Sequence, residues 1–131
     1  MAHGNRNPKP GDLIEIKRSR LYQHWALYVG DGYVVHVTDV GPKDVVMSVS
    51  SGSNLSGKAQ VKKQLLKDVV GNDAWVVNNK YDQSHTPLPV EDIIKGAERL
   101  IGMEVEYSVL LRNCEHFVTL LRYEKKFSDQ V

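Results

Sequence analysis

The first third of the chain has the alternating apolar and polar positions that are typical of half-buried β-strands. Residues 13–16 alternate with a period of two, and residues 25–29 and 33–38 are rich in β-branched and aromatic side chains. The last two segments flank Gly30-Asp31-Gly32, a strong signal for a tight turn. The pattern therefore predicts three early strands, of which the second and third form a hairpin.

The middle of the chain carries weaker signals. Residues 39–57 are rich in Ser and Gly and read as a loop, within which residues 45–49 fit a short strand. Residues 60–70 are ambiguous between strand and helix, whereas residues 74–78, which contain Trp75-Val76-Val77, read as a strand. We expect a sheet of about five or six strands, a usual size for a domain.

Two helices are predicted after the prolines at positions 87 and 89. The first has Gly102 where a left-handed C-terminal cap would lie, and its apolar positions recur at helical spacing: Val90, Ile93, Ile94, Ala97 and Ile101. The second has an apolar stripe at Cys114, Phe117, Val118 and Leu121, and Asn113 is placed to cap its start. Strands and helices are segregated along the chain, which predicts an α+β fold with an antiparallel sheet packed against helices.

Length and composition limit the classes of protein to consider. The chain has 131 residues, 41% of them hydrophobic and 25% charged, which indicates one globular domain after a flexible N-terminal arm at residues 1–9. A net charge of +1 gives no overall field toward nucleic acid. No apolar run approaches the roughly 18 residues that span a bilayer. The single cysteine excludes an internal disulfide and favours a reducing, cytoplasmic setting.

Cys114 is the candidate nucleophile. In the first turn of a helix, the macrodipole and unpaired N–H groups would favour its thiolate. The alternative is a small buried apolar residue, a common fate of free cysteine. A nucleophilic thiol also needs a histidine base from elsewhere in the fold.

The candidate bases are His24 and His36. His116 is two residues from Cys114 and points to another helix face, and the two remaining histidines lie in the arm and in a proline-bounded loop. A two-residue loop in the hairpin would put His24 and His36 on opposite faces of the sheet, whereas a three-residue loop would put His36 opposite Ala26 and both histidines on one face. Catalysis requires the shared face.

Two further readings concern ligands. Cys114, His24 and His36 would make an open zinc site, but no local ligand spacing supports a metal, so we expect neither metal nor cofactor. The basic residues Lys17, Arg18 and Arg20 lie just before His24. They are either a solvated loop or a site for phosphate headgroups at a membrane surface.

Several sequence words, taken together, resemble a known family. These are PGDLIEI (10–16), HWALY (24–28), GDGYVVH (30–36) and NCEHFV (113–118), supported by VNNKYD (77–82), PLP (87–89) and LRY (121–123). They closely resemble the HRAS-like suppressor proteins, or phospholipase A/acyltransferases, of the lecithin:retinol acyltransferase group. The resemblance runs from about residue 8 to residue 123, and implies one catalytic domain at residues 10–124 with a permuted papain-like (NlpC/P60) architecture.

The resemblance also implies roles for individual residues. Cys114 would be the nucleophile, His24 the base and His36 the residue that orients it. Tyr22 would help to stabilise the oxyanion, and Asn113 would support the surroundings of the nucleophile. The backbone N–H of Cys114 is a physically reasonable further oxyanion donor.

The activity implied is that of a thiol-dependent phospholipase A1/A2 and acyltransferase. Cys114 would take an acyl chain from a glycerophospholipid and pass it to water, to the amine of phosphatidylethanolamine or to a lysophospholipid. The alternatives are a papain-like thiol hydrolase of amides, which the same dyad would serve, and a noncatalytic lipid- or protein-binding module. The hydrophobic tail common in the family is absent from residues 125–131, so we expect a cytoplasmic, peripherally membrane-associated chain whose longer form would be anchored through such a tail.

Overall fold

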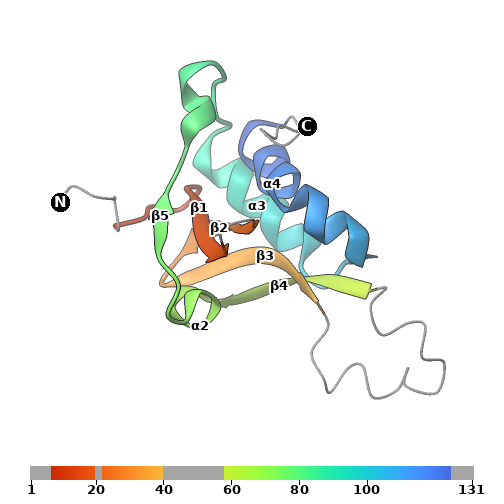
Figure 1. Cartoon of the computed structure of the whole chain (residues 1–131). Coiled ribbons are helices and arrows are strands. Elements are labelled where there is room, and N and C mark those ends of the chain that lie inside the picture. Colours follow the sequence, from red (N-terminus) through yellow and green to blue (C-terminus); the bar gives the residue numbers. More distant parts are fainter. Residues whose placement is uncertain (1–6, 20–21, 40–57, 125–131) are drawn as a thin grey trace, which may run out of the picture.

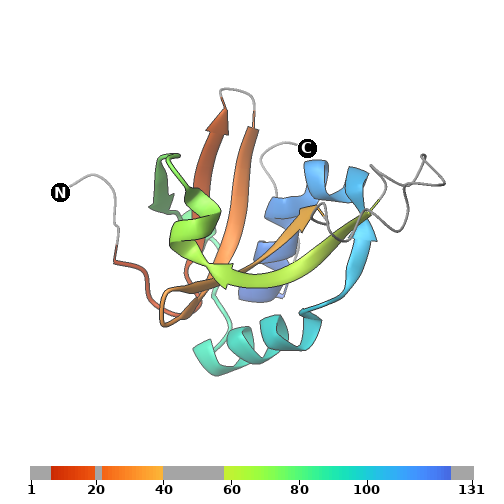
Figure 2. The same ribbon diagram turned by 90° about the horizontal axis from the view of Figure 1, so that it is seen from below.

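A six-stranded sheet forms the centre of the molecule (Figures 1 and 2). The computed structural model describes residues 7–19, 22–39 and 58–124. The strand order is β5-β1-β2-β3-β4-β6, and every neighbouring pair is antiparallel. The strands are β1 (Leu13–Ser19), β2 (Tyr22–Gly30), β3 (Tyr33–Asp39), β4 (Lys58–Leu65), β5 (Trp75–Val77) and β6 (Glu104–Glu106).

Helices cover both faces of this sheet. The long helix α4 (Tyr107–Tyr123) packs on β2 and β3, with α3 (Val90–Leu100) beside it. The short helix α2 (Leu66–Val70) lies on the opposite side, and the 3-10 helix η3 (Lys80–Gln83) projects beyond β5 (Figure 1). This arrangement confirms the predicted α+β class with an antiparallel sheet.

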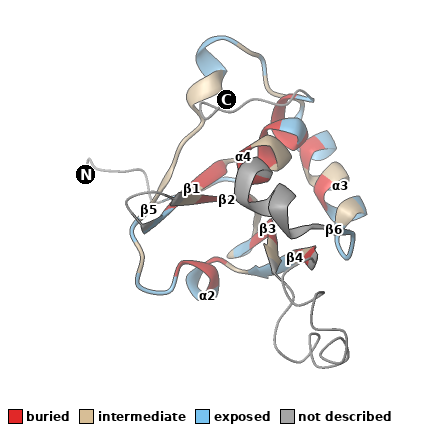
Figure 3. Cartoon of the chain, turned by 45° about the vertical axis from the view of Figure 1, so that its right-hand side comes forward, coloured by how far each residue is buried: buried red, intermediate tan, exposed pale blue. Residues whose placement is uncertain are grey.

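Two apolar clusters fill the space between these layers, as the buried segments in Figure 3 show. The larger cluster joins the sheet to α3 and α4, and the smaller one joins β1, β2 and β3 to α2. The larger contains Trp25, Leu27, Val35, Val37, Val61, Ile93 and Val118, and the smaller contains Ile14, Ile16, Ala26, Val34, Leu66 and Val69. Both faces of the central strands are therefore buried.

The elements of the second half agree with the pattern in most places. Helix α3 ends at Leu100, and Gly102 has the expected positive φ of 94°. The ambiguous segment at residues 60–70 is divided, because β4 ends at Leu65 and α2 begins at Leu66. Trp75–Val77 is a strand, as predicted. The strand proposed for residues 45–49 lies outside the described residues.

The predicted start of the last helix is wrong. Helix α4 begins at Tyr107, not after Asn113, so Asn113 is an interior helix residue and not an N-cap. The stretch Leu110-Leu111-Arg112 consists of strong helix formers and carries the helix through Asn113. Cys114 consequently lies seven residues after the first residue of the helix.

The hairpin between β2 and β3 has the register that the chemistry requires, but it closes differently from the prediction. Asp31 and Gly32 form a two-residue turn between Gly30 and Tyr33, which are paired. A register shift between Tyr28 and Gly30 then restores the pairing of Leu27 with Val35. Continued along the strands, this register puts His36 opposite Ala26. A bulge thus has the effect expected of a third loop residue.

Candidate active site

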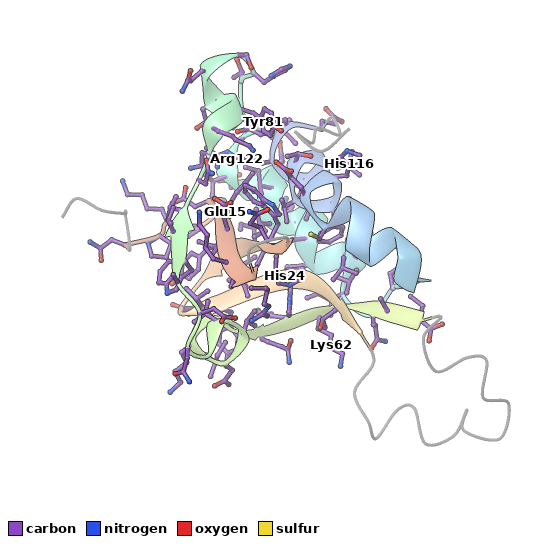
Figure 4. All side chains as sticks on the ribbon, viewed as in Figure 1. Glu15, His24, Lys62, Tyr81, His116 and Arg122 are labelled. Atoms are coloured by element: carbon purple, nitrogen blue, oxygen red, sulfur yellow. The ribbon has the colours of Figure 1, made fainter. Side chains whose placement is uncertain are left out.

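His24 and His36 form a directly bonded pair inside the molecule. They lie diagonally on β2 and β3, with Nε2 of His24 2.7 Å from Nδ1 of His36 and a nearly perpendicular ring orientation. Only 4% of His24 and 2% of His36 is exposed. Figure 4 shows His24 over the middle of the sheet. The predicted shared face of the two histidines is confirmed.

The pair continues to a third polar side chain. Nε2 of His36 lies 2.6 Å from Oε1 of Gln64 on β4. The register pairs His36 with Lys62 and Val34 with Gln64, so Gln64 lies diagonally across from His36, two residues along the same row of β4 as Lys62. Three neighbouring strands therefore each contribute one member to a row of hydrogen-bonded side chains.

Burial keeps both histidines neutral. It lowers the pKa of His24 to about 3, with further lowering by His36 and by the positive charge of Arg18. Burial also lowers the pKa of His36, while the hydrogen bond to Gln64 acts in the opposite direction. A neutral imidazole has one ring nitrogen with a free lone pair, which is the form that a general base requires.

Helix α4 brings Cys114 to the backbone of β2 beside His24. The Cys114 side chain is buried in the larger cluster, and its Sγ lies 3.7 Å from the carbonyl oxygen of Gln23, the residue before His24. Successive side chains of a strand point to opposite faces of the sheet, so the His24 ring leaves β2 on the face opposite to Trp25 of that cluster. The structure thus joins the two histidines directly and brings the thiol to the backbone beside them.

The position of Cys114 inside α4 corrects two expectations. Only the first four N–H groups of a helix are unpaired, and the helix dipole acts within the first turn. Neither condition holds seven residues into α4, where the N–H of Cys114 serves the helix itself. Helix position therefore neither activates the thiol nor supplies an oxyanion donor.

The residue after the thiol anchors this part of α4. Glu115 is only 4% exposed, and its carboxylate lies 3.2 Å from the Tyr81 hydroxyl and 3.3 Å from Lys80 Nζ. Lys80 also lies over the ring of Trp25, 5.4 Å from its centroid. This cluster fixes the helix next to Cys114 against η3 and β2.

A second anchor holds the C-terminal end of α4 (Figure 4). The guanidinium of Arg122 donates two hydrogen bonds to the Asp82 carboxylate, at 3.1 and 2.8 Å, and one to the Gly11 carbonyl oxygen, at 2.6 Å. The Tyr123 hydroxyl also donates to Asp82. Burial acts to raise the pKa of Asp82, but these hydrogen bonds lower it below its ordinary value.

The other predicted site residues lie on β1, β2 and α4 or outside the described residues. Tyr22 is the first residue of β2 and Asn113 lies within α4, but their side chains are outside the described part of the structure, as is Arg20 entirely. Lys17 and Arg18 belong to β1 and not to a loop, because the strand continues to Ser19. Their acidic partners are Glu15, at 3.9 Å from Lys17, and Asp73, at 2.7 Å from Arg18.

The described residues offer neither a metal-binding cluster nor a membrane-spanning helix. They contain no group of three or more His, Cys, Asp or Glu side chains that could hold a metal ion. Among the same residues, no helix combines the length and the apolar character needed to cross a bilayer. His116 lies on the outer side of α4, away from His24, as Figure 4 shows.

An α+β domain with a buried histidine pair beside a helix-borne cysteine belongs to the class of papain-like thiol acyl-transfer folds. A family profile described as lecithin retinol acyltransferase matches residues 6–127, and the chain belongs to this family.

Curated relatives agree with this assignment. The chain is 58% identical to phospholipase A and acyltransferase 1 of Homo sapiens over 124 residues, covering 95% of this chain and 73% of the relative. It is 54% identical to phospholipase A and acyltransferase 3 of Mus musculus, covering 95% and 76%. It is 50% identical to phospholipase A and acyltransferase 4 of Homo sapiens, covering all of this chain and 79% of the relative.

Sequence reasoning missed three residues that the structure places around the pair and the helix. Glu115 and Arg122 were inside recognised words, NCEHFV and LRY, but their partners are about 30 to 40 positions away in the chain. Gln64 carried no signal, because its segment was ambiguous between strand and helix. Its position diagonally across from His36 becomes visible only when β3 and β4 are paired.

Proposed function

We propose that this chain is a phospholipase A1/A2 and acyltransferase that uses Cys114 as its nucleophile and His24 as its base. The observation that supports this assignment most directly is the buried, neutral His24–His36 pair next to the only cysteine of the chain. The names of the relatives indicate the same reaction class. His36 orients His24 through their hydrogen bond.

The first half-reaction forms an acyl-enzyme. His24 uses Nε2 for the bond to His36, so we assign its Nδ1 to the thiol proton of Cys114. The sulfur attacks the ester carbonyl of a glycerophospholipid and gives a tetrahedral oxyanion. When this intermediate collapses, the ester C–O bond breaks, the proton returns from His24 to the leaving alkoxide, and a lysophospholipid departs. The fatty acyl group remains as a thioester on Cys114.

The second half-reaction determines the product. His24 takes a proton from the acceptor, whose oxygen or nitrogen attacks the thioester, and the thiol is regenerated. Water as acceptor gives a fatty acid, the amine of phosphatidylethanolamine gives an N-acylated lipid, and a lysophospholipid gives O-acyl transfer. One base and one nucleophile serve all three outcomes.

The oxyanion needs donors other than the helix N–H of Cys114. We assign this role to Tyr22, at the start of β2 and two residues before His24, with Asn113 supporting the nucleophile from the preceding position of α4. A preorganised donor of this kind typically contributes about 10²–10³-fold to the rate. Replacement of Tyr22 by Phe tests the assignment by its effect on kcat.

The test of the proposed function is the covalent intermediate itself. Incubation with phosphatidylcholine should add one fatty acyl mass to the protein, and Cys114→Ala should abolish both the adduct and ester cleavage. His24→Ala should slow adduct formation by roughly 10²–10⁴-fold, the usual contribution of general base catalysis. Intact-mass spectrometry on a time course measures both quantities.

His116→Ala is the matched control, because His116 is two residues from Cys114 and on the outer side of α4. It should form the adduct at the wild-type rate. Ester cleavage by Cys114→Ala within a few-fold of wild type would contradict the covalent mechanism. An adduct from an amide substrate but not from phosphatidylcholine would identify an amide hydrolase in place of a phospholipase.

A further inference from the structure

Gln64 ends the row of hydrogen bonds that begins at His24 and passes through His36. Gln64 lies on β4, next to β3 and one strand removed from His24 on β2, and its amide oxygen contacts Nε2 of His36. We propose that Gln64 is a positioning residue that selects the reactive tautomer of His24 by fixing the tautomer of His36. This inference rests on the proposed function of His24 as the base.

The Gln64 amide oxygen determines which ring nitrogen of each histidine carries the proton. An amide oxygen accepts hydrogen bonds and does not donate them, so Nε2 of His36 carries the proton in its 2.6 Å contact with Oε1 of Gln64. Because His36 is neutral, its Nδ1 is then unprotonated and accepts. The 2.7 Å contact with this atom requires Nε2 of His24 to donate. The remaining nitrogen, Nδ1 of His24, is left with a lone pair for the thiol proton.

Without an acceptor at position 64 the same pair of rings has a second arrangement. His36 can carry its proton on Nδ1 and donate to Nε2 of His24, which moves the proton of His24 to Nδ1. That tautomer has no lone pair on the nitrogen assigned to Cys114, so it is inactive as the base. An incorrect histidine tautomer is costly in thiol and serine catalysis, even when the geometry is preserved.

The surroundings of His36 leave this role to Gln64. The charged and titratable groups that act on His36 are His24 on β2, Arg18 on β1 and Lys62 on β4. The cationic groups of Arg18 and Lys62 have only donors, so they cannot accept the proton of Nε2. Among these groups and Gln64, only the Gln64 amide oxygen can accept the proton on Nε2 of His36. This acceptor fixes which atom donates in each hydrogen bond of the row.

The experiment compares three variants of the full chain. Gln64→Leu removes the acceptor, and Gln64→Glu keeps an acceptor but adds a negative charge. Gln60→Leu is the matched control, since Gln60 lies in the same row of β4 and its exposed amide donates to the Gly102 carbonyl oxygen instead. Two quantities are measured: the ring tautomers, by two-bond ¹⁵N–¹H correlation spectra of ¹⁵N-histidine-labelled protein, and the rate of acyl-adduct formation against pH.

In the wild type and in Gln60→Leu we expect both His24 and His36 to be protonated on Nε2. In Gln64→Leu, Nδ1-protonated forms of both rings should appear together, and acylation should slow at least about tenfold. The loss should not exceed the roughly 10²–10⁴-fold that a general base supplies in total. In Gln64→Glu the wild-type tautomers should remain. The carboxylate favours the charged form of His36, so the acid limb of the rate profile should move to higher pH.

The outcomes separate this proposal from the proposed function. Wild-type tautomers in Gln64→Leu overturn the relay, whether or not the acylation rate falls, because a rate loss alone would be a general structural effect. If the wild type forms no acyl adduct, the proposed function fails. The tautomer spectra still decide the role of Gln64 in that case, since they do not depend on a substrate.

Discussion

At the scale of single residues, the burial of His24 and His36 in their neutral form makes the stability of the fold depend on pH. Both rings are buried in their neutral form, and burial is the main cause that lowers the pKa of each. In the unfolded chain the same rings titrate near the ordinary histidine value of about 6.5. The native state therefore binds fewer protons than the unfolded state just below this pH.

This difference predicts a loss of stability on mild acidification. The folded-state pKa is lowered, so stability is complete above about pH 6.5 and falls as the unfolded chain takes up protons. Between pH 7 and pH 5.5 we expect the free energy of unfolding to fall by about 1 kcal/mol for each buried histidine. Urea unfolding at the two pH values measures the fall. It should be smaller by about 2 kcal/mol in a His24→Gln/His36→Gln variant.

The comparison uses only the change between the two pH values, so a different absolute stability of the variant does not affect it. The window ends above the ordinary titration range of Asp and Glu, which limits their contribution. An equal fall in wild type and variant would show that the pair titrates in the folded protein as it does in the unfolded chain, which contradicts the lowered pKa.

The pair also shows what local sequence determines at this scale. The spacing of His24 and His36 around a glycine turn left two registers open, and only the chemical demand for a shared face selected the one observed. The bulge between Tyr28 and Gly30 that produces this register was not predicted. Gln64 was beyond reach, because its role depends on the pairing of β4 with β3, and no residue within its own segment reports that pairing. Contacts inside one hairpin are local, whereas the third member of the row comes from 28 residues away.

At the scale of elements, α4 is the decisive piece, because it carries Cys114 to β2. The sheet packs against its apolar stripe, and polar anchors hold it at two points, Glu115 in the middle and Arg122 near the end. The predicted stripe was correct, but the predicted start was not. An asparagine before a stripe resembles an N-cap, and only the preceding leucine-rich turn distinguishes the interior of a longer helix.

The Arg122 anchor should contribute strongly to stability. Arg122→Met removes the guanidinium that binds both Asp82 and the Gly11 carbonyl oxygen. Arg122 is buried but Asp82 is exposed, so solvent screens the ion pair and we expect a loss of about 2 kcal/mol, mainly from the lost charged hydrogen bonds. Arg122→Lys should recover only part of this loss, since an ammonium cannot make the bidentate contact. Urea unfolding at pH 7 measures both variants.

Arg99→Met provides the control, because Arg99 is exposed on α3 and has the same change of side chain. Its effect should stay within about 0.5 kcal/mol, as is usual for surface substitutions. If Arg122→Met is no more costly than Arg99→Met, the anchor contributes geometry but little free energy.

At the scale of the whole molecule, the fold class was accessible from the sequence because most of the strands precede the two long helices, α3 and α4. Alternation predicted β1, β2 and β3, and helical spacing predicted α3. The order in which the six strands pair was not accessible, because β6 joins the sheet through β4, more than 40 residues earlier in the chain. Such nonlocal pairing leaves little trace in local periodicity.

The charges along β1 affect how the domain binds a lipid surface. The basic residues expected to bind headgroups, Lys17 and Arg18, lie on β1 beside acidic partners, and Arg18 is paired with Asp73 at 2.7 Å. We propose that Lys17 and Arg18 attract anionic lipid but that Asp73 reduces this attraction. A basic residue near an anionic membrane contributes about 1 kcal/mol, and the effect fades over a Debye length of roughly 10 Å at 0.1 M salt.

Three variants test this balance by cosedimentation with phosphatidylserine-containing and pure phosphatidylcholine vesicles. Lys17→Gln/Arg18→Gln should weaken binding to the anionic vesicles at least about fivefold at low salt, the equivalent of about 1 kcal/mol. Asp73→Asn should strengthen binding, because it releases the charge of Arg18. Lys95→Gln/Arg99→Gln on α3 changes the net charge of the molecule by the same amount and should leave binding near the wild-type level. Equal weakening by the β1 and α3 double variants would mean that vesicle binding depends on net charge alone. Unchanged binding in all variants would mean that Lys17 and Arg18 do not contact the lipid surface.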